Sequence, residues 1–286
     1  MYPILLRIGS FTLYSYTVAL VAGIALGTWV SLRRAQASGI AAALVLDAGF
    51  WALLAGLLGA RLAYVVANWA YYVDHLQAAI DVSEGGLIWH GALLGGCAAC
   101  ATWTVARSRR DPSLPRLLAL FDVAAPGLAL GGALGWLGAL LTGSSYGVEA
   151  SGYAPPLAWL AARLPDIYGV DALRFMTQPA MIVTCLLLSG LLWVLQSRLC
   201  ARPGRLFALY LGLYALADFF VWFLRGDGTW HRGLWLWQWA ALVEVCVAIG
   251  LGVYAAIEST SRQETEASAD RRLSSVVRRP TTRGQP

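Results

Sequence analysis

Seven long apolar stretches constrain this chain more than any other feature of its sequence. A helix needs about 20 predominantly apolar residues to cross a bilayer core of ~30 Å, because it rises ~1.5 Å per residue. Seven stretches are long enough, with ends uncertain by several residues: 11–32, 44–66, 86–105, 117–141, 178–195, 206–224 and 234–257. The sequence therefore predicts an all-α integral membrane protein with about seven transmembrane helices.

The composition agrees with a membrane protein. Of the 286 residues, 58% are hydrophobic and 13% are charged, whereas soluble domains average about 45–50% apolar and about 25% charged residues. A disordered chain or a small disulfide scaffold is excluded by the same numbers. The apolar residues form continuous runs and do not alternate with polar ones, which argues against sheet.

The arginines predict the orientation in the membrane. All 21 basic residues are Arg. Fifteen of them follow the first, third, fifth and seventh stretches, and five lie in the segments on the other side. Because basic residues gather on the cytoplasmic side, we expect the N-terminus outside and the C-terminus in the cytoplasm. The net charge of +5 thus reflects topology, and we expect no nucleic-acid partner.

The composition changes near residue 258. We expect residues 1–258 to form one seven-span membrane domain with an outer loop insertion at 143–177. Residues 259–286 are polar and Arg-rich, which predicts a disordered cytoplasmic tail. The pair Cys97 and Cys100 has no second pair nearby, so we interpret these thiols as packing residues. We expect neither a metal nor a cofactor.

The segment around His90 is rich in glycine, which favours a tight turn and close helix packing. This places His90 about one turn below the outer surface of the third stretch. Ionisable residues at such depth are costly and tend to be functional, and a neutral imidazole can take a proton from a thiol or hydroxyl. A histidine that only hydrogen-bonds a neighbouring helix is the other interpretation, and the spacing leaves both open.

Three other charged residues stand out. Arg61 lies towards the outer end of the second stretch, where a guanidinium group binds a lipid phosphate or snorkels to the headgroups. Arg225 precedes a Gly-Asp-Gly turn, and anion binding and simple turn chemistry are both open. Asp218 lies inside the sixth stretch, and we expect it to pair with Arg61 or Arg225.

Six short segments of the chain form a recognisable series: Tyr-Pro-Ile-Leu-Leu-Arg-Ile-Gly at 2–9, Leu-Tyr-Ser-Tyr at 13–16, Gly-Ala-Arg at 59–61, Gly-Gly-Leu-Ile-Trp-His-Gly at 85–91, Asp-Val-Ala-Ala-Pro at 122–126 and Leu-Arg-Gly-Asp at 224–227. In these segments the chain resembles the prolipoprotein diacylglyceryl transferase family over about residues 2–258, and Gln238 falls where that family has a glutamine.

The resemblance implies an activity and a site. The activity is transfer of a diacylglyceryl group from phosphatidylglycerol to the lipobox cysteine thiol of preprolipoproteins, at the bacterial plasma (inner) membrane. The implied partners are phosphatidylglycerol, preprolipoprotein signal peptides and the lipid bilayer. By resemblance, His90 and Tyr16 are catalytic, and we expect Arg61 and Arg225 to bind the lipid phosphate. The implied structural glycines of the site are Gly86, Gly91, Gly135, Gly138 and Gly147.

Several positions depart from the family pattern. After the fourth stretch the glycine frame is kept, but an Arg, two Asn and a Glu of the family are replaced by Trp136, Ala139, Thr142 and Ser144. In the sixth stretch an Arg and a Glu are replaced by Asp218 and Trp222. Losing one group that stabilises developing charge costs about 10²–10³ in rate. A catalytically inactive relative that binds lipid or lipoprotein precursor is therefore an alternative, and a transporter is a weaker one.

Overall fold

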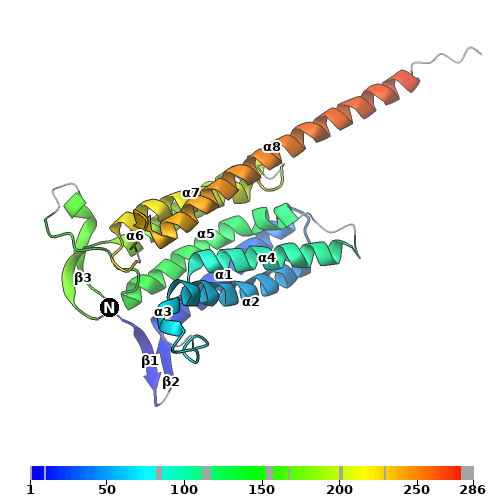
Figure 1. The fold of residues 1–286 in the computed structure, drawn as a ribbon. Helices are drawn as coiled ribbons and strands as arrows, with labels where there is room; N and C mark the ends of the chain where they lie inside the picture. The colour runs from blue at the N-terminus through cyan, green and yellow to red at the C-terminus, as the bar shows by residue number, and fades with distance from the viewer. Residues whose placement is uncertain are drawn as a thin grey trace, which may run out of the picture.

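The computed structural model describes residues 2–9, 11–81, 86–109, 111, 117–152, 157–166, 168–199, 202–228 and 230–277. Within these ranges seven long helices run side by side, each over one of the predicted apolar stretches (Figure 1). They are α1 (Ser15–Ala37), α2 (Ala42–Ala67), α4 (Trp89–Ser108), α5 (Leu117–Thr142), α6 (Thr177–Leu199), α7 (Arg205–Val221) and α8 (Leu236–Val277).

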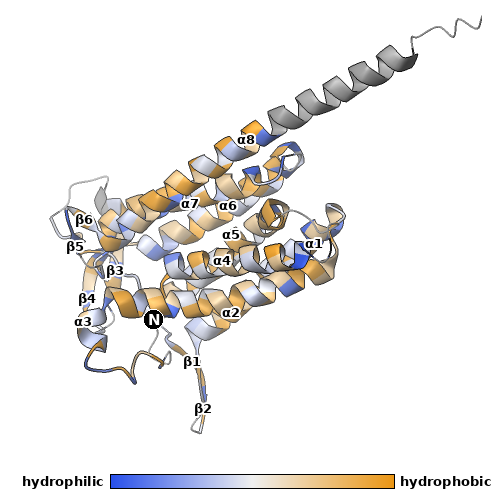
Figure 2. Cartoon of the chain, turned by 45° about the vertical axis from the view of Figure 1, so that its right-hand side comes forward, coloured by the Kyte–Doolittle hydropathy of each residue, from blue (hydrophilic) through white to orange (hydrophobic). Residues whose placement is uncertain are grey.

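The helical membrane fold predicted from the sequence is confirmed. Six helices are long and apolar enough to cross a membrane, with the α7 span extended by the short 3-10 helix η2 (Trp222–Leu224) and the α8 span covering Leu236–Glu258. The seventh, α4, has 20 residues and includes His90, several glycines and Arg107. Figure 2 shows apolar residues covering most of these helices. The total of seven spans and their orientation stay predictions.

Short strands gather at one end of the bundle, where the sequence led us to expect no strand. Three antiparallel hairpins form there: β1 (Ile4–Ile8) with β2 (Phe11–Tyr14), β3 (Ala161–Pro165) with β4 (Asp171–Phe175), and β5 (Trp230–His231) with β6 (Leu234–Trp235). The helix α3 (Trp69–Tyr72) lies at the same end (Figure 1). We call this the hairpin end.

The first predicted span began too early. Residues 11–14 are apolar enough to extend a helix, but they form β2, and α1 begins at Ser15. Hydrogen bonds to β1 satisfy the backbone groups of these residues. A short apolar run can form a strand as well as a helix. The start of the first span is therefore corrected to Ser15.

The last helix is longer than we expected. The backbone of α8 continues as helix to Val277, through residues that we assigned to a disordered tail. The division into a membrane domain (1–258) and a cytoplasmic tail (259–286) stays a prediction.

Small residues hold the helices together in two close pairs. A Cβ atom at Gly127 or Gly91 would collide with the backbone of Gly27 or Gly59, respectively. The first contact joins α5 to α1, and the second joins α4 to α2. Such small-residue contacts let membrane helices approach closely, and the second one fixes the part of α4 that carries His90.

The start of helix α7 is bound to α5 by a carboxylate. Asp122 accepts hydrogen bonds from the backbone N–H groups of Gly204 and Phe207, at 2.7 and 2.8 Å. These are among the donors that a helix start leaves unpaired. Farther along α7, the side chains of Tyr210 and Tyr214 are buried against α5 and α6. This packing directs Asp218 into the interior.

Candidate functional site

A buried histidine lies between two carboxylates that come from different helices. The Nδ1 atom of His90, in the first turn of α4, is 2.8 Å from Oε1 of Glu244 on α8. Its Nε2 atom is 3.4 Å from Oδ2 of Asp218 on α7. The side chains of His90, Asp218 and Glu244 are 9%, 5% and 12% exposed, respectively. We call these three residues the imidazole cluster.

Local packing sets the position of His90. The backbone N–H of Ile88, just before α4, donates to the carbonyl of Ala60 on α2. Gly91 packs directly on Gly59 of the same helix. The imidazole ring is stacked on the ring of Trp237, with centroids 5.6 Å apart and planes 15° from parallel. Contacts with α2 thus fix the backbone around His90, and Trp237 of α8 packs on the face of its ring.

Trp222 connects the imidazole cluster to the hairpin end. Its indole N–H donates to Oδ2 of Asp218 at 3.1 Å. On its other side, the guanidinium carbon of Arg225 lies 3.8 Å from the ring centre. A stacked Arg and Trp attract each other because the ring face is negative. His90 and Arg225 are therefore linked through two intervening side chains.

Arg225 is itself paired at the hairpin end. It makes two hydrogen bonds to the carboxylate of Asp227, at 2.7 and 2.9 Å, and one to Oγ of Ser145 at 3.2 Å. Its guanidinium carbon is also 5.9 Å from the ring of Trp136. The indole N–H of Trp136 donates to the hydroxyl of Tyr214 at 3.3 Å. The rings of Trp136 and Trp222 thus flank the cation.

Arg61 binds the loop between α2 and α4. Its guanidinium group donates to the carbonyl oxygens of Ala79 and Ala78, at 2.9 and 2.7 Å, and to that of Gly86 at 3.2 Å. It also lies over the rings of Tyr64 and Tyr72. The structure therefore makes Arg61 an anchor of this loop, while its contact with a lipid phosphate stays a prediction.

The pairing that we expected for Asp218 is wrong. This carboxylate contacts His90 and Trp222, whereas the side chain of Arg225 donates hydrogen bonds to Asp227 and Ser145. Asp218 is directed towards α4 and α8, and the helix ends before Arg225 turns back over Trp222. Asp218 and Arg225 are seven residues apart, but the 3-10 turn between them keeps their charged groups from pairing.

Tyr16 lies in the first turn of α1, against α5. A Cβ atom at Gly138 would be 3.0 Å from Cδ2 of Tyr16, so this glycine makes room for the ring. The structure gives no hydrogen bond or ring contact between Tyr16 and His90 within the described ranges. The catalytic role of Tyr16 stays a prediction.

The glycines predicted to shape the site differ in their surroundings. Gly86 has a φ of 77° and touches Arg61, so both its backbone and its lack of a side chain are required. A Cβ atom at Gly147 would collide with the backbone of Phe175, in the outer loop insertion. At Gly135 a Cβ atom would meet nothing within 4 Å. Packing thus explains every predicted glycine except Gly135.

Segment 143–177 contains a second cluster of charges and is joined to Arg225 by a β-bridge. Buried Arg174 pairs with Asp166 at 3.1 Å and with Glu149 at 3.6 Å, and its guanidinium carbon is 5.1 Å from the ring centre of Tyr146. Burial raises the pKa of Tyr146 above its usual value, and nearby carboxylates add to the effect. A β-bridge joins residues 147 and 225, so this loop supports the segment that carries Arg225.

Glu244 was missed by the sequence analysis. It is a carboxylate within the most apolar of the candidate spans, and an ionisable residue at such a position is costly unless it is paired. That signal was present in the sequence. The partner was not, because His90 lies 154 residues away.

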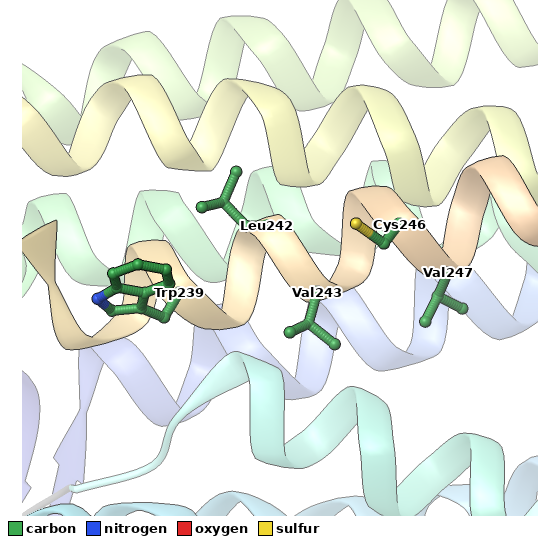
Figure 3. Close-up of a pocket in the computed structure, with 5 residues that line it drawn as sticks. All are labelled: Trp239, Leu242, Val243, Cys246 and Val247. Carbon is green, nitrogen blue, oxygen red and sulfur yellow. The ribbon is translucent and has the colours of Figure 1, made fainter.

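An apolar groove on α8 is separate from the imidazole cluster. It is lined by Trp239, Leu242, Val243, Cys246 and Val247 (Figure 3). Trp239, Val243 and Val247 are 43–63% exposed, on the outward side of a predicted span. Such a surface is expected where a helix faces lipid.

Comparison with known proteins gives one consistent result. Residues 3–254 match the family model described as prolipoprotein diacylglyceryl transferase. Three relatives carry the name phosphatidylglycerol–prolipoprotein diacylglyceryl transferase. The one from Thermosynechococcus vestitus is 30% identical over 250 residues, which cover 85% of this chain and 88% of the relative. One from Dehalococcoides mccartyi is 31% identical over 253 residues, covering 88% and 93%. One from Bacillus cereus is 30% identical over 223 residues, covering 77% and 80%.

Proposed function

Because this chain belongs to the prolipoprotein diacylglyceryl transferase family, we propose that it transfers a diacylglyceryl group from phosphatidylglycerol to the lipobox cysteine thiol of preprolipoproteins. It is a multi-pass membrane protein of a bacterial family. We place it in the plasma (inner) membrane, where the donor lipid and the signal peptides of its acceptors meet.

The reaction requires two kinds of group. The cysteine sulfur forms a bond to a glycerol carbon, the bond from that carbon to the phosphate oxygen breaks, and glycerol phosphate leaves with the electron pair. The thiol proton passes to a base. A base beside the thiol and a cation beside the phosphate therefore both lower the barrier.

We assign the base to His90. The observation that carries this assignment is the position of its imidazole, which is buried and contacted at both ring nitrogens by carboxylates from other helices. Nucleophile activation by an oriented imidazole is a recurrent arrangement, in which a carboxylate holds the ring. The side of the ring near Asp218 and Trp222 is the one that leads to Arg225.

We assign the phosphate contact to Arg225. A guanidinium group binds phosphate and carboxylate with the same two-pronged geometry, and Arg225 already holds the carboxylate of Asp227 in this way. A phosphate oxygen would replace Asp227 at the guanidinium. Arg61 then supports the site by anchoring the neighbouring loop, and Tyr16 supplies an orienting hydroxyl at the hairpin end.

Transfer by the purified full-length chain tests this function. The protein is reconstituted into vesicles of phosphatidylglycerol with a lipobox peptide, and the mass of the peptide is followed. We expect the peptide to gain a diacylglyceryl group and His90→Asn to abolish the gain. The matched control is His231→Asn, because the His231 side chain is exposed on β5. A folded wild-type chain that adds no diacylglyceryl group overturns the proposal.

A catalytically inactive lipid-binding relative is the second candidate. The observation in its favour is that Trp136 and Trp222 flank Arg225 where the family has polar residues, and that Asp227 occupies the guanidinium group. This candidate predicts that the chain binds phosphatidylglycerol vesicles but fails to rescue a strain depleted of its transferase. Rescue that depends on His90 decides against it.

A further inference from the structure

We propose that Glu244 is the positioning residue that orients the His90 imidazole for proton transfer, an inference that rests on the proposed function. Glu244 acts through His90 and does not touch the substrate. It comes from the last helix, which contributes no catalytic residue to the site as predicted from the sequence.

The two ring nitrogens of His90 are held unequally. The distance of 2.8 Å from Nδ1 to Glu244 is that of a short charge-assisted hydrogen bond. The distance of 3.4 Å from Nε2 to Asp218 is longer than the usual N–H···O range of about 2.7–3.2 Å. In the arrangement that we propose, the Nδ1–H group of His90 donates a hydrogen bond to Glu244, and Nε2 is then the nitrogen that receives a proton. The thiol proton therefore goes to Nε2.

Glu244 has one polar contact in the described part of the chain. Its Oε1 atom bonds His90, while its Oε2 atom is buried without a hydrogen-bond partner there. A buried carboxylate that only stabilised the fold would be expected to use both oxygens. The hydrogen bond to His90 thus explains why a carboxylate is present at position 244.

Asp218 is less suited to orient the ring. Its Oδ2 atom, the one nearest His90, already accepts the indole N–H of Trp222. Asp218 is therefore fixed by the η2 turn that follows its own helix, whereas Glu244 approaches His90 from α8. The stacked Trp237 ring is on the same helix as Glu244, so α8 restrains both the plane and the rotation of the imidazole.

Steady-state transfer kinetics with the full-length chain test the inference. The variants are Glu244→Gln, which keeps the size of the side chain, and Glu244→Asp, which keeps its charge. We expect Glu244→Gln to lower kcat by about 10²- to 10⁴-fold, as loss of an oriented base does, with KM for phosphatidylglycerol within about twofold. Glu244→Asp should recover part of kcat. The matched control is Glu258→Gln, on the same helix, with kcat unchanged.

A spectroscopic readout separates orientation from folding. The protein is labelled with ¹⁵N-histidine and studied by NMR. The signal of His90 is the one that is lost in the His90→Asn variant. We expect wild-type His90 to have its proton on Nδ1 and Glu244→Gln to change that signal, while the thermal unfolding curve and the signals of His75 and His231 stay the same.

The outcomes distinguish this inference from the function on which it rests. No transfer by a folded wild-type chain overturns the proposed function, and the kinetic role of Glu244 with it. Transfer by the wild type with an equal kcat for Glu244→Gln overturns the inference alone. An unchanged His90 signal in Glu244→Gln also overturns it, as does a lower kcat that merely follows a loss of folded protein in both Glu244 variants.

Discussion

The guanidinium carbon of Arg225 lies 3.8 Å from the centre of the Trp222 ring. The same indole donates its N–H to Asp218, which in turn lies beside His90. A cation at the hairpin end and an imidazole inside the bundle are therefore connected through Trp222 and Asp218. We expect a substitution of Trp222 to affect both Arg225 and His90.

Replacing Trp222 with Phe separates these two contacts. The ring beneath Arg225 remains, but Asp218 loses its indole donor, and a buried acceptor left without a donor costs about 1–3 kcal/mol. We expect the free energy of unfolding to fall by this amount and transfer to slow. Chemical denaturation in detergent measures the first effect. Trp159→Phe is the matched control, since Trp159 is 76% exposed, and an equal loss in both variants would contradict the prediction.

Replacing Arg225 with Lys tests the phosphate contact. Lysine keeps the charge but lacks the planar fork that holds a phosphate with two hydrogen bonds. We expect KM for phosphatidylglycerol to rise by about tenfold, which corresponds to about 1.4 kcal/mol, while the unfolding temperature changes little. The control is Arg163→Lys, on the exposed side of β3. An unchanged KM in Arg225→Lys would argue for a purely structural Arg225.

Replacing Arg61 with Lys distinguishes loop anchoring from phosphate binding. The variant keeps a positive charge but loses the planar guanidinium group, whose separate nitrogens donate to Ala78, Ala79 and Gly86. We expect faster amide hydrogen exchange in residues 72–81 by mass spectrometry, because the loop loses its anchor. The exposed Arg33→Lys serves as the control. Unchanged exchange with a raised KM would instead support a phosphate contact at Arg61.

Replacing Gly91 with Ala tests the close packing of α2 and α4. The added methyl group collides with the backbone of Gly59, and overpacking of this kind costs about 1–3 kcal/mol. We expect a lower unfolding temperature and, because His90 is the preceding residue, slower transfer. Gly190→Ala on α6 is the control, since a Cβ atom there meets nothing within 4 Å. Equal stability of the two variants would rule out this packing.

Single cysteines test the predicted orientation. In a background without native cysteines, Ser151→Cys lies in the outer loop insertion and Ser108→Cys at the end of α4. We expect a membrane-impermeant maleimide to label position 151 in intact cells and position 108 only after permeabilisation. The opposite pattern would reverse the topology derived from the arginines.

Part of this fold follows from local sequence alone. The seven apolar stretches predicted the seven long helices because a bilayer demands internal backbone hydrogen bonding over about 20 residues. The start of the first helix was predicted wrongly at residue 11, since four apolar residues satisfy a strand as well as a helix. Residues 234–235 of β6 were assigned to the seventh span in the same way, whereas β3, β4 and β5 lie in segments predicted as loops.

The candidate site divides in a similar way. His90 was identified from its depth and its glycine-rich surroundings, without its partners. Asp218 was identified as an exception but assigned to the wrong partners, because its direction depends on how α7 is rotated in the bundle. Glu244 was overlooked, although a carboxylate in such an apolar helix was visible in the sequence.

The sequence by itself determined which segments become helices and which family the chain resembles, because hydropathy, glycine spacing and motifs are properties of neighbouring residues. Only the tertiary structure decided that Glu244 holds His90 across 154 residues and that Arg61 binds a loop of backbone carbonyls. Those contacts depend on the rotation and close approach of whole helices, which glycine contacts and capping across the bundle set together.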